Sequence, residues 1–253
     1  MHRRWGPISC ALALACIGEE AQHKAAGNIR FRQGDVDGAL REYAQAVKQT
    51  PSDAEAQVLY GNALFEKERY DQARAAFARA VAIMPEATAA HRGLAKVALR
   101  QHRGADAERH LGDVLSHDAH DREALRDLAG LRAERGDLAG AEELLLRAAA
   151  AARHDVRTLY PLALVQTRRG ETDAALATAD ALAAAEPERG FADYVRAIAL
   201  ARAGRTDPAL DALARALAKG VDDIGQVEAD QNLAALRTHP RFRELLSQAR
   251  EDR

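Results

Sequence analysis

The sequence predicts an all-α fold in which six helix–turn–helix units follow one another along the chain. The first observation is a strict period of 34 residues. The second is that apolar residues within each period stand three and four apart, as on one face of a helix, while no stretch shows the alternation of a strand. One series of small residues shows the period clearly: Ala39, Ala73, Ala107, Ala141, Ala175 and Ala209.

Two further series keep the same spacing. Small residues recur ahead of the alanines at Gly27, Gly61, Ala95, Ala129, Ala163 and Ala197. A mostly bulkier series follows them at Tyr43, Phe77, Leu111, Leu145, Ala179 and Leu213. A small residue on each helix lets a pair of helices approach closely, and the larger residue one turn further on fills the remaining gap. Because such units bury their apolar faces only against their neighbours, we expect one elongated solenoid.

Residues 1–18 precede the repeats and differ from them. His2-Arg3-Arg4 is basic, and the stretch from Pro7 to Gly18 is largely apolar. This order is typical of a short secretory signal, with small residues before Cys16 as its cleavage site. The stretch also resembles a bacterial lipoprotein signal, which implies lipid attachment to Cys16. We therefore expect export, and the alternative is that residues 1–18 form an extra amphipathic turn of a cytoplasmic protein.

Six repeats are expected over residues 20–221, with starts near residues 20, 54, 88, 122, 156 and 190. The first helix of a repeat ends at a turn such as Gly34-Asp35, because glycine easily adopts the left-handed conformation of a helix end. The second helix ends before a proline such as Pro51, since proline cannot donate the hydrogen bond that would continue it. Ser52 and Glu55 then stand at capping-box spacing for the next helix.

These features resemble the tetratricopeptide repeat (TPR), a helix–turn–helix unit with small and aromatic residues at fixed positions. The second repeat matches best, with Tyr60, Gly61, Leu64, Ala73, Phe77, Ala80 and Pro85. The resemblance covers residues 20–221 and implies a right-handed superhelical solenoid. It also implies a protein that binds other proteins.

Residues 222–253 follow the last repeat. One short apolar pattern runs from Ile224 to Arg237, and a second begins at Pro240, a residue that suits the first position of a helix. We expect capping helices here that cover the apolar face of the sixth repeat.

The composition excludes several classes of function. The 36 Lys and Arg residues nearly balance the 38 Asp and Glu residues, so no basic field for nucleic acid is expected. No apolar run is long enough to span a bilayer, and we expect membrane contact only through the N-terminal lipid. Cys10 and Cys16 are the only cysteines and both lie in residues 1–18, so the remaining chain has no disulfide.

No catalytic or cofactor motif is present. The sequence lacks a P-loop, a dinucleotide-binding turn, a nucleophile elbow and a zinc-protease motif. Glu142-Glu143 and Asp222-Asp223 are interpreted as solvated charge rather than as acid–base pairs. We therefore predict no enzyme, no catalytic residue and no cofactor.

A group of four histidines in the third repeat invites a metal interpretation. The group occurs near the turn into the next repeat, which we expect to be polar and solvated, and no cysteine or second carboxylate-rich cluster accompanies it. We therefore predict no metal site. The four residues are His102, His110, His117 and His120.

The TPR resemblance also implies where a partner binds, because the first helices of such repeats line a groove. Amides there would bond to a peptide backbone, cations would pair with carboxylates, and aromatic rings would provide an apolar docking patch. The residues at the matching positions are Lys24, Asn28, Asn62, Phe65, Arg92, Lys96, Arg100, Tyr160 and Tyr194.

Two of these residues resemble part of a known peptide clamp. Lys24 and Asn28 stand where chaperone-binding TPR proteins place the first two residues of their carboxylate clamp. The remaining clamp positions hold Leu59, Ala89 and Gly93, so the clamp is incomplete.

The sequence therefore predicts a non-enzymatic scaffold or adaptor that binds a peptide or partner protein in its groove. Together with the N-terminal segment, this favours a role in bacterial envelope assembly, with the protein periplasmic or lipid-anchored. Two alternatives stay open: a cytoplasmic regulatory TPR protein, and an accessory subunit of an envelope enzyme.

Overall fold

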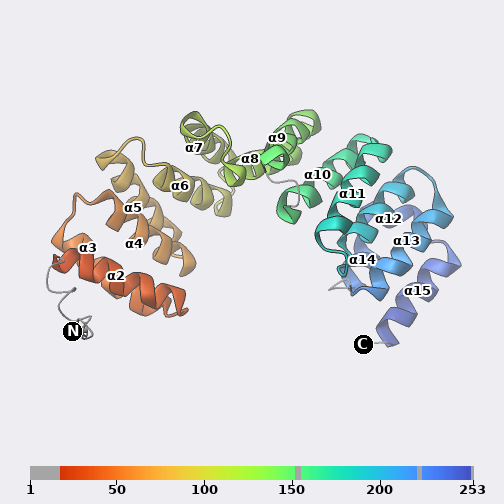
Figure 1. The fold of residues 1–253 in the computed structure, drawn as a ribbon, viewed down its shortest axis with the longest axis horizontal. Helices are drawn as coiled ribbons and strands as arrows, with labels where there is room; N and C mark the ends of the chain where they lie inside the picture. The colour runs from red at the N-terminus through yellow and green to blue at the C-terminus, as the bar shows by residue number, and fades with distance from the viewer. Residues whose placement is uncertain (1–17, 152–154, 221–223, 252–253) are drawn as a thin grey trace, which may run out of the picture. The chain divides into compact units, whose positions relative to one another are not determined.

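The computed structural model describes residues 18–151, 155–220 and 224–251. Helices dominate, and no β-strand occurs in these three ranges (Figure 1). The chain forms two compact units, residues 1–119 and 120–253. Cys16, the predicted site of lipid attachment, lies outside the described residues, as do Asp222 and Asp223. The all-α prediction is confirmed for the described chain.

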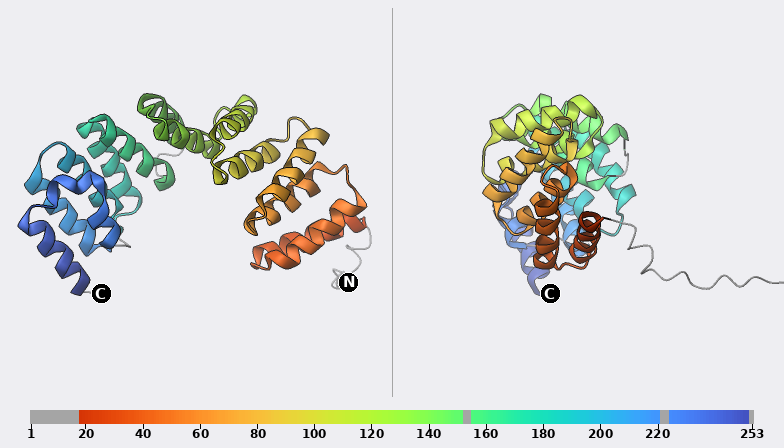
Figure 2. Two further views of the ribbon diagram at one scale, coloured as in Figure 1. Left: turned by 180° about the vertical axis from the view of Figure 1, so that it is seen from behind. Right: turned by 90° about the vertical axis from the view of Figure 1, so that its left-hand side faces the viewer.

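Within its described residues, the first unit consists of three helix pairs. The two helices of each pair pack against each other, and each pair packs on the next (Figures 1 and 2). The first helices begin at residues 19, 54 and 88. The pairs are α2 (Glu19–Arg32) with α3 (Val36–Gln49), α4 (Ala54–Glu66) with α5 (Tyr70–Ile83), and α6 (Thr88–Arg100) with α7 (Gly104–His117).

The second unit continues the pattern and then departs from it. Its pairs are α8 (Arg122–Glu134) with α9 (Leu138–Ala151), α10 (Val156–Arg169) with α11 (Thr172–Ala185), and α12 (Phe191–Arg202) with α13 (Thr206–Ala218). After them come the short helix α14 (Ile224–Ala229), the 3-10 helix η1 (Gln231–Leu236) and α15 (Pro240–Glu251).

The residues of the 34-residue series form the contacts within and between helix pairs. All six alanines of the first series are fully buried. The ring of Phe77 on α5 lies between the first helices α4 and α6, where a Cβ atom added to Gly61 would come within 2.7 Å of the ring and one added to Gly93 within 2.5 Å. No real side chain tolerates such distances, so these two positions require glycine unless the ring moves.

The predicted helix ends are largely confirmed. Gly34 and Gly170 adopt a left-handed backbone with φ of +80°, and each lies within two residues of the end of a first helix. α3 ends at Gln49, two residues before Pro51. The predicted cap at Ser52 was wrong, because the carboxylate of Asp53, one residue later, accepts the backbone N–H of Glu55 at 2.8 Å.

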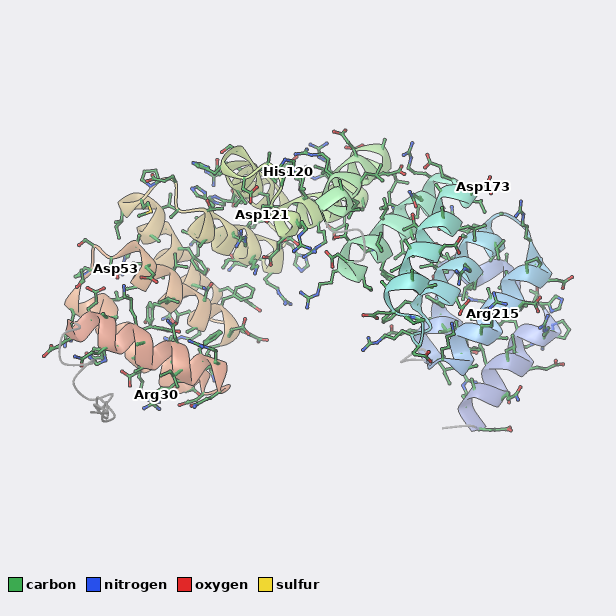
Figure 3. The ribbon with its side chains drawn as sticks, viewed as in Figure 1. Arg30, Asp53, His120, Asp121, Asp173 and Arg215 are labelled. Carbon is green, nitrogen blue, oxygen red and sulfur yellow. The ribbon has the colours of Figure 1, made fainter. Side chains whose placement is uncertain are left out.

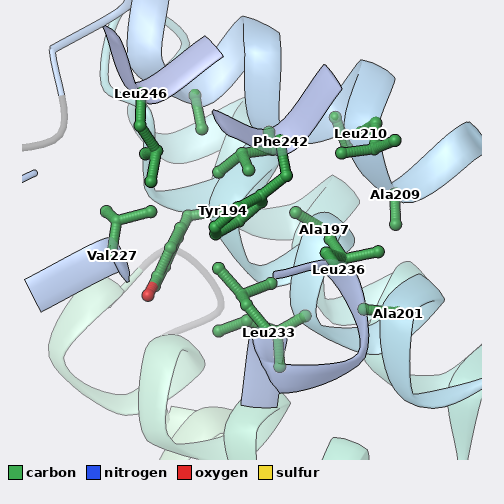
Figure 4. Packing of buried hydrophobic residues seen from close by; sticks show 14 of the residues in the cluster. Tyr194, Ala197, Ala201, Ala209, Leu210, Val227, Leu233, Leu236, Phe242 and Leu246 are labelled. Carbon is green, nitrogen blue, oxygen red and sulfur yellow. The ribbon is translucent and has the colours of Figure 1, made fainter. Parts of the chain in front are cut away.

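The C-terminal elements cover the last helix pair, as predicted. Phe242 and Leu246 of α15 and Leu233 and Leu236 of η1 are buried against α12 and α13 (Figure 4). The apolar pattern over 224–237 is divided between α14 and η1 because Asp230 interrupts it. The Asp230 carboxylate accepts the backbone N–H of Asn232 at 2.8 Å and so caps η1.

Among the described helices, none combines the length and the apolar character that crossing a membrane requires.

Candidate partner-binding surface

The first helices of the first unit share one face. α2 contacts α4, and α4 contacts α6, so residues one period apart become neighbours on adjacent helices. Asn28, Asn62 and Lys96 are such a set, since each follows the previous one by 34 residues. We call the exposed and half-buried residues of α2, α4 and α6 on this face the first-helix surface: Asn28, Phe31, Arg32, Leu59, Asn62, Phe65, Arg92, Lys96 and Arg100.

A pocket of about 130 Å³ opens on this surface between α2 and α4. Its lining combines amides, a cation and apolar groups: Asn28, Phe31, Arg32, Tyr43, Leu59 and Asn62. Two of the predicted binding residues, Asn28 and Asn62, are therefore brought to one pocket. The exposed Asn62 belongs to α4, whereas the half-buried Asn28 belongs to α2.

The amide of Asn28 is held by a buried tyrosine. The hydroxyl of Tyr43 donates a hydrogen bond to Oδ1 of Asn28 at 2.7 Å. Burial raises the pKa of Tyr43, so its hydroxyl stays protonated as a donor. Since the amide oxygen is engaged, the orientation of Asn28 is fixed and its amide nitrogen points away from Tyr43.

Phe65 packs between the second and third repeats while part of it stays exposed. Its ring meets that of Tyr70 edge-on, with centroids 5.5 Å apart and an interplanar angle of 62°. The guanidinium carbon of Arg100 lies 5.9 Å from the Phe65 centroid, at cation–π distance. These contacts order Phe65 and Arg100 on the surface, so both predicted residues occupy defined positions there.

Lys24 has a structural role within the unit. Its Nζ lies 2.7 Å from Asp53, 2.8 Å from Glu55 and 3.3 Å from Glu20, which joins the first repeat to the second (Figure 3 labels Asp53). Burial opposes the charge, but the hydrogen bonds to these carboxylates outweigh it and hold the pKa of Lys24 above its usual value. Its charge is thus balanced inside the protein, and we assign Lys24 to repeat packing rather than to a carboxylate clamp.

The other predicted cations of this unit lie on α6. Arg92 and Lys96 are one turn apart and half-buried, and both take part in polar or electrostatic interactions within the protein. Arg100, one further turn along, is exposed. One side of α6 therefore carries three cations.

In the second unit, the two predicted tyrosines have different environments. Tyr160 is half-buried and packs edge-on against Phe191, with centroids 5.8 Å apart, and the Arg189 guanidinium lies 5.6 Å from the Phe191 centroid. Tyr194 has only 9% of its surface exposed, and its hydroxyl donates to Asp230 at 2.6 Å (Figure 4 shows its ring among the core residues).

This packing assigns Tyr194 to the core rather than to a binding surface. Burial first, and the hydrogen bond to Asp230 second, raise the pKa of Tyr194 above its usual value. The cause is the segment after the last repeat, which places Asp230 against α12. The repeat pattern alone carries no signal for that contact.

Two buried carboxylates were missed at the level of sequence. Glu142 is only 6% exposed, and its carboxylate accepts hydrogen bonds from Gln166 at 3.1 Å and from Arg169. The interpretation of Glu142 as solvated charge was therefore wrong, although the neighbouring Glu143 is exposed. The reason is that Gln166 and Arg169 reach it from α10, the first helix of the next repeat.

Asp193 is the second of these carboxylates, with 2% of its surface exposed. Burial tends to raise its pKa, but hydrogen bonds from Lys219, Arg215 and Arg196 at 2.8 to 3.1 Å lower the pKa below its usual value (Figure 3 labels Arg215). A carboxylate held ionised by three cations is suited to a structural ion pair rather than to proton transfer.

The four histidines of the third repeat do not converge. His102, His117 and His120 are exposed, while His110 is half-buried on α7 and faces His91 of α6. Sequence spacing offered no reason to group His91 with His110, because the contact depends on how the two helices pair.

Comparisons with known proteins agree with this architecture. Two family models described as tetratricopeptide repeat match the chain. One matches residues 24–90 and 160–223, and the other matches residues 64–131 and 98–162. No curated protein matches the chain.

Solved structures share the fold at low sequence identity. The crystal structure of PilW, described as a widely conserved type IV pilus biogenesis factor, is 16% identical with a TM-score of 0.70, covering 87% of this chain and 99% of that one. YrrB, described as a TPR protein with an unusual peptide-binding site, is 19% identical with a TM-score of 0.63, covering 74% and 96%. A tetratricopeptide repeat protein from Parabacteroides merdae is 14% identical with a TM-score of 0.69, covering 91% and 89%.

Proposed function

Because this chain belongs to the tetratricopeptide repeat family, we propose that it is a scaffold without catalytic activity. In this proposal, the first-helix surface binds an extended segment of a partner protein. The observation that carries the proposal is the pocket between α2 and α4, which Asn28 and Asn62 line together with the apolar groups of Phe31 and Leu59.

The chemistry of the pocket suits a peptide better than a small molecule. An asparagine side chain offers both a donor and an acceptor, which matches the N–H and C=O groups of an extended backbone. The volume of about 130 Å³ is below the roughly 300–1,000 Å³ of typical small-molecule sites. Phe31 and Leu59 provide an apolar wall for one side chain of the segment.

The charges of the same surface indicate an acidic segment. Arg32 lines the pocket, and Arg92, Lys96 and Arg100 follow one another along α6. Guanidinium groups bind carboxylates through two parallel hydrogen bonds, and this geometry fixes the register of a bound segment. Lys24 is not part of this set, because the carboxylates of Asp53 and Glu55 already pair with it.

This proposal is tested by substitutions that spare the core. With the partner recovered by crosslinked co-purification from the native host, we expect Asn62→Ala, and separately the pair Arg92→Glu and Lys96→Glu, to weaken binding at least tenfold. Arg79→Glu on the second helix α5 is exposed and serves as the matched charge control. Unchanged affinity in the surface variants, with circular dichroism confirming that they are folded, would exclude this surface.

Two related structures support the general class. YrrB is described as having a peptide-binding site, and PilW as a pilus biogenesis factor, so chains of this fold include a peptide binder and a pilus biogenesis factor.

We also propose that the protein is exported and acts in envelope assembly. The support is the order of residues 1–18, a basic start followed by an apolar stretch that ends in small residues and Cys16. Cell fractionation with mass spectrometry of the N-terminus tests this. Export predicts periplasmic or membrane-bound protein lacking Met1, and lipidation adds an acylated N-terminal Cys16. Cytosolic protein that retains Met1 would instead support the cytoplasmic regulatory alternative.

A further inference from the structure

Three potential metal ligands converge in the third repeat, on the helix pair α6 and α7. Nδ1 of His91 lies 3.3 Å from Nδ1 of His110 and 3.1 Å from a carboxylate oxygen of Asp113. The same Asp113 oxygen lies 3.6 Å from Nδ1 of His110. His91 comes from the first helix, whereas His110 and Asp113 stand three residues apart on one face of the second.

These separations match the coordination sphere of one metal ion. Zinc binds imidazole nitrogen and carboxylate oxygen at about 2.0–2.2 Å, so two ligands of a tetrahedron stand about 3.3–3.6 Å apart. Octahedral coordination at the same bond lengths brings neighbouring ligands to about 3 Å. The three observed distances, 3.1, 3.3 and 3.6 Å, average near the tetrahedral value.

The His91 ring is already held in the tautomer that coordination needs. Its Nε2 lies 2.9 Å from the backbone carbonyl oxygen of Pro85, at the end of the second repeat. A carbonyl only accepts, so Nε2 carries the proton and Nδ1 presents its lone pair to the cluster. Metal-bound histidines are commonly oriented in this way through their other ring nitrogen.

From this geometry we propose that His91, His110 and Asp113 form a binding site for a divalent transition-metal ion, with Zn²⁺ as the best match to its ligands. Two imidazoles and one carboxylate suit zinc, and a water molecule completes the four ligands. The Asp113 side chain is 43% exposed, so this side of the site is open to water. The bound ion would tie α6 to α7 and to the turn after α5.

The surrounding charges are compatible with this assignment. Nη2 of Arg109 lies 3.3 Å from Nε2 of His110. Since a metal-bound His110 carries its proton on Nε2, Arg109 must turn away, and its 66% exposed side chain is able to do so.

The alternative is that these three side chains are held together by hydrogen bonds alone, without a metal ion. The same short distances are met by a hydrogen-bonded His–His–Asp cluster, in which one Nδ1–H is shared. The two accounts differ in a measurable way, because only the first predicts saturable binding of one ion. This proposal differs from the prediction made from sequence that no metal binds, because the contact between His91 and His110 depends on the packing of α6 against α7.

Titration of the full chain, without an affinity tag, against Zn²⁺ in competition with a chromophoric chelator tests the proposal. We expect one ion per chain, and Co²⁺ in place of Zn²⁺ should give the intense visible absorption of tetrahedral coordination. His110→Gln and Asp113→Asn should each weaken Zn²⁺ binding at least tenfold. Zn²⁺ should also raise the melting temperature of the wild-type chain and not that of His110→Gln.

The control replaces a histidine of the same repeat outside the cluster. His102 is exposed and has a left-handed backbone with φ of +54°, a conformation that asparagine tolerates, so His102→Asn should bind Zn²⁺ like the wild type. Asp113→Asn is a nearly isosteric change at a partly exposed position, so we expect this variant to fold like the wild type. Absence of one-to-one binding, or equal affinity in His110→Gln, Asp113→Asn and His102→Asn, would overturn the assignment.

Discussion

At the scale of single residues, packing in this protein depends on small side chains facing large ones. Phe77 is the clearest case, since its ring occupies the space that a Cβ at Gly61 or Gly93 would need. Tyr43 has the same relation to Gly27, where an added Cβ would come within 2.4 Å of the ring. Helix propensity alone would favour alanine at these helical positions, so glycine is present there for steric reasons.

We therefore expect Gly93→Ala to destabilise the protein relative to Gly112→Ala by about 1–3 kcal/mol, the usual cost of overpacking. Both substitutions gain the same helix propensity, but Gly112 on α7 has no neighbour within 4 Å of an added Cβ. Urea denaturation followed by circular dichroism measures the difference. Equal unfolding free energies for the two variants would contradict the steric account.

At the scale of helices, the repeats are tied together by polar pairs at nearly constant sequence separation. Lys24 reaches Asp53, and Arg126 reaches Asp155, each 29 residues further on. Lys67 likewise reaches back 30 residues to Asp37. Because each helix pair repeats the geometry of the previous one, a favourable pair in one repeat recurs at the equivalent position of another.

The ion pair between Lys24 and Asp53 predicts that the free energy of unfolding depends on pH. Burial tends to raise the pKa of Asp53, but the hydrogen bond from Lys24 and the positive charge of Lys24 lower it to about 2, below the usual 3.8. A pKa depressed by folding means that ionised Asp53 stabilises the native state above about pH 4. That contribution is lost as the pH falls from about 4 to about 2.

Lys24→Met should therefore destabilise the protein at pH 7, by about 1–3 kcal/mol, because Asp53 loses its charged donor. The variant should also lose less stability than the wild type between about pH 4 and pH 2. Melting temperatures over this range give both values. Parallel pH profiles for the two proteins would show that Lys24 does not set the pKa of Asp53.

At the scale of the whole molecule, the sequence predicted what depends on the period and missed what depends on side chains meeting across repeats. The alanine series and the glycine turns each follow from local spacing, and all are found. Tyr194, Glu142 and the pairing of His91 with His110 each depend on a second element whose position the period does not encode. The sequence therefore indicated that the candidate surface lies on the first helices. It did not indicate which of the predicted residues already pair or pack within the protein.

A substitution in the C-terminal helix α15 tests how far the last repeat depends on the element that covers it. Phe242 is 2% exposed and packs with Leu210 and Leu213 of α13. Phe242→Ala should cost about 3–5 kcal/mol in the second unit through lost burial and a cavity. Hydrogen exchange should show the largest loss of protection in α13 and α15, whereas unchanged protection in α13 would mean that the cap is dispensable.

We propose that a partner binds to the first helices of the repeats. A photo-crosslinking amino acid placed at exposed Asn62 on α4, and separately at exposed Arg79 on α5, tests this most directly in the native host. We predict a crosslinked partner from position 62, with the crosslink mapping to an acidic, extended segment, and none from position 79. Crosslinks from position 79 with none from position 62 would contradict the claim.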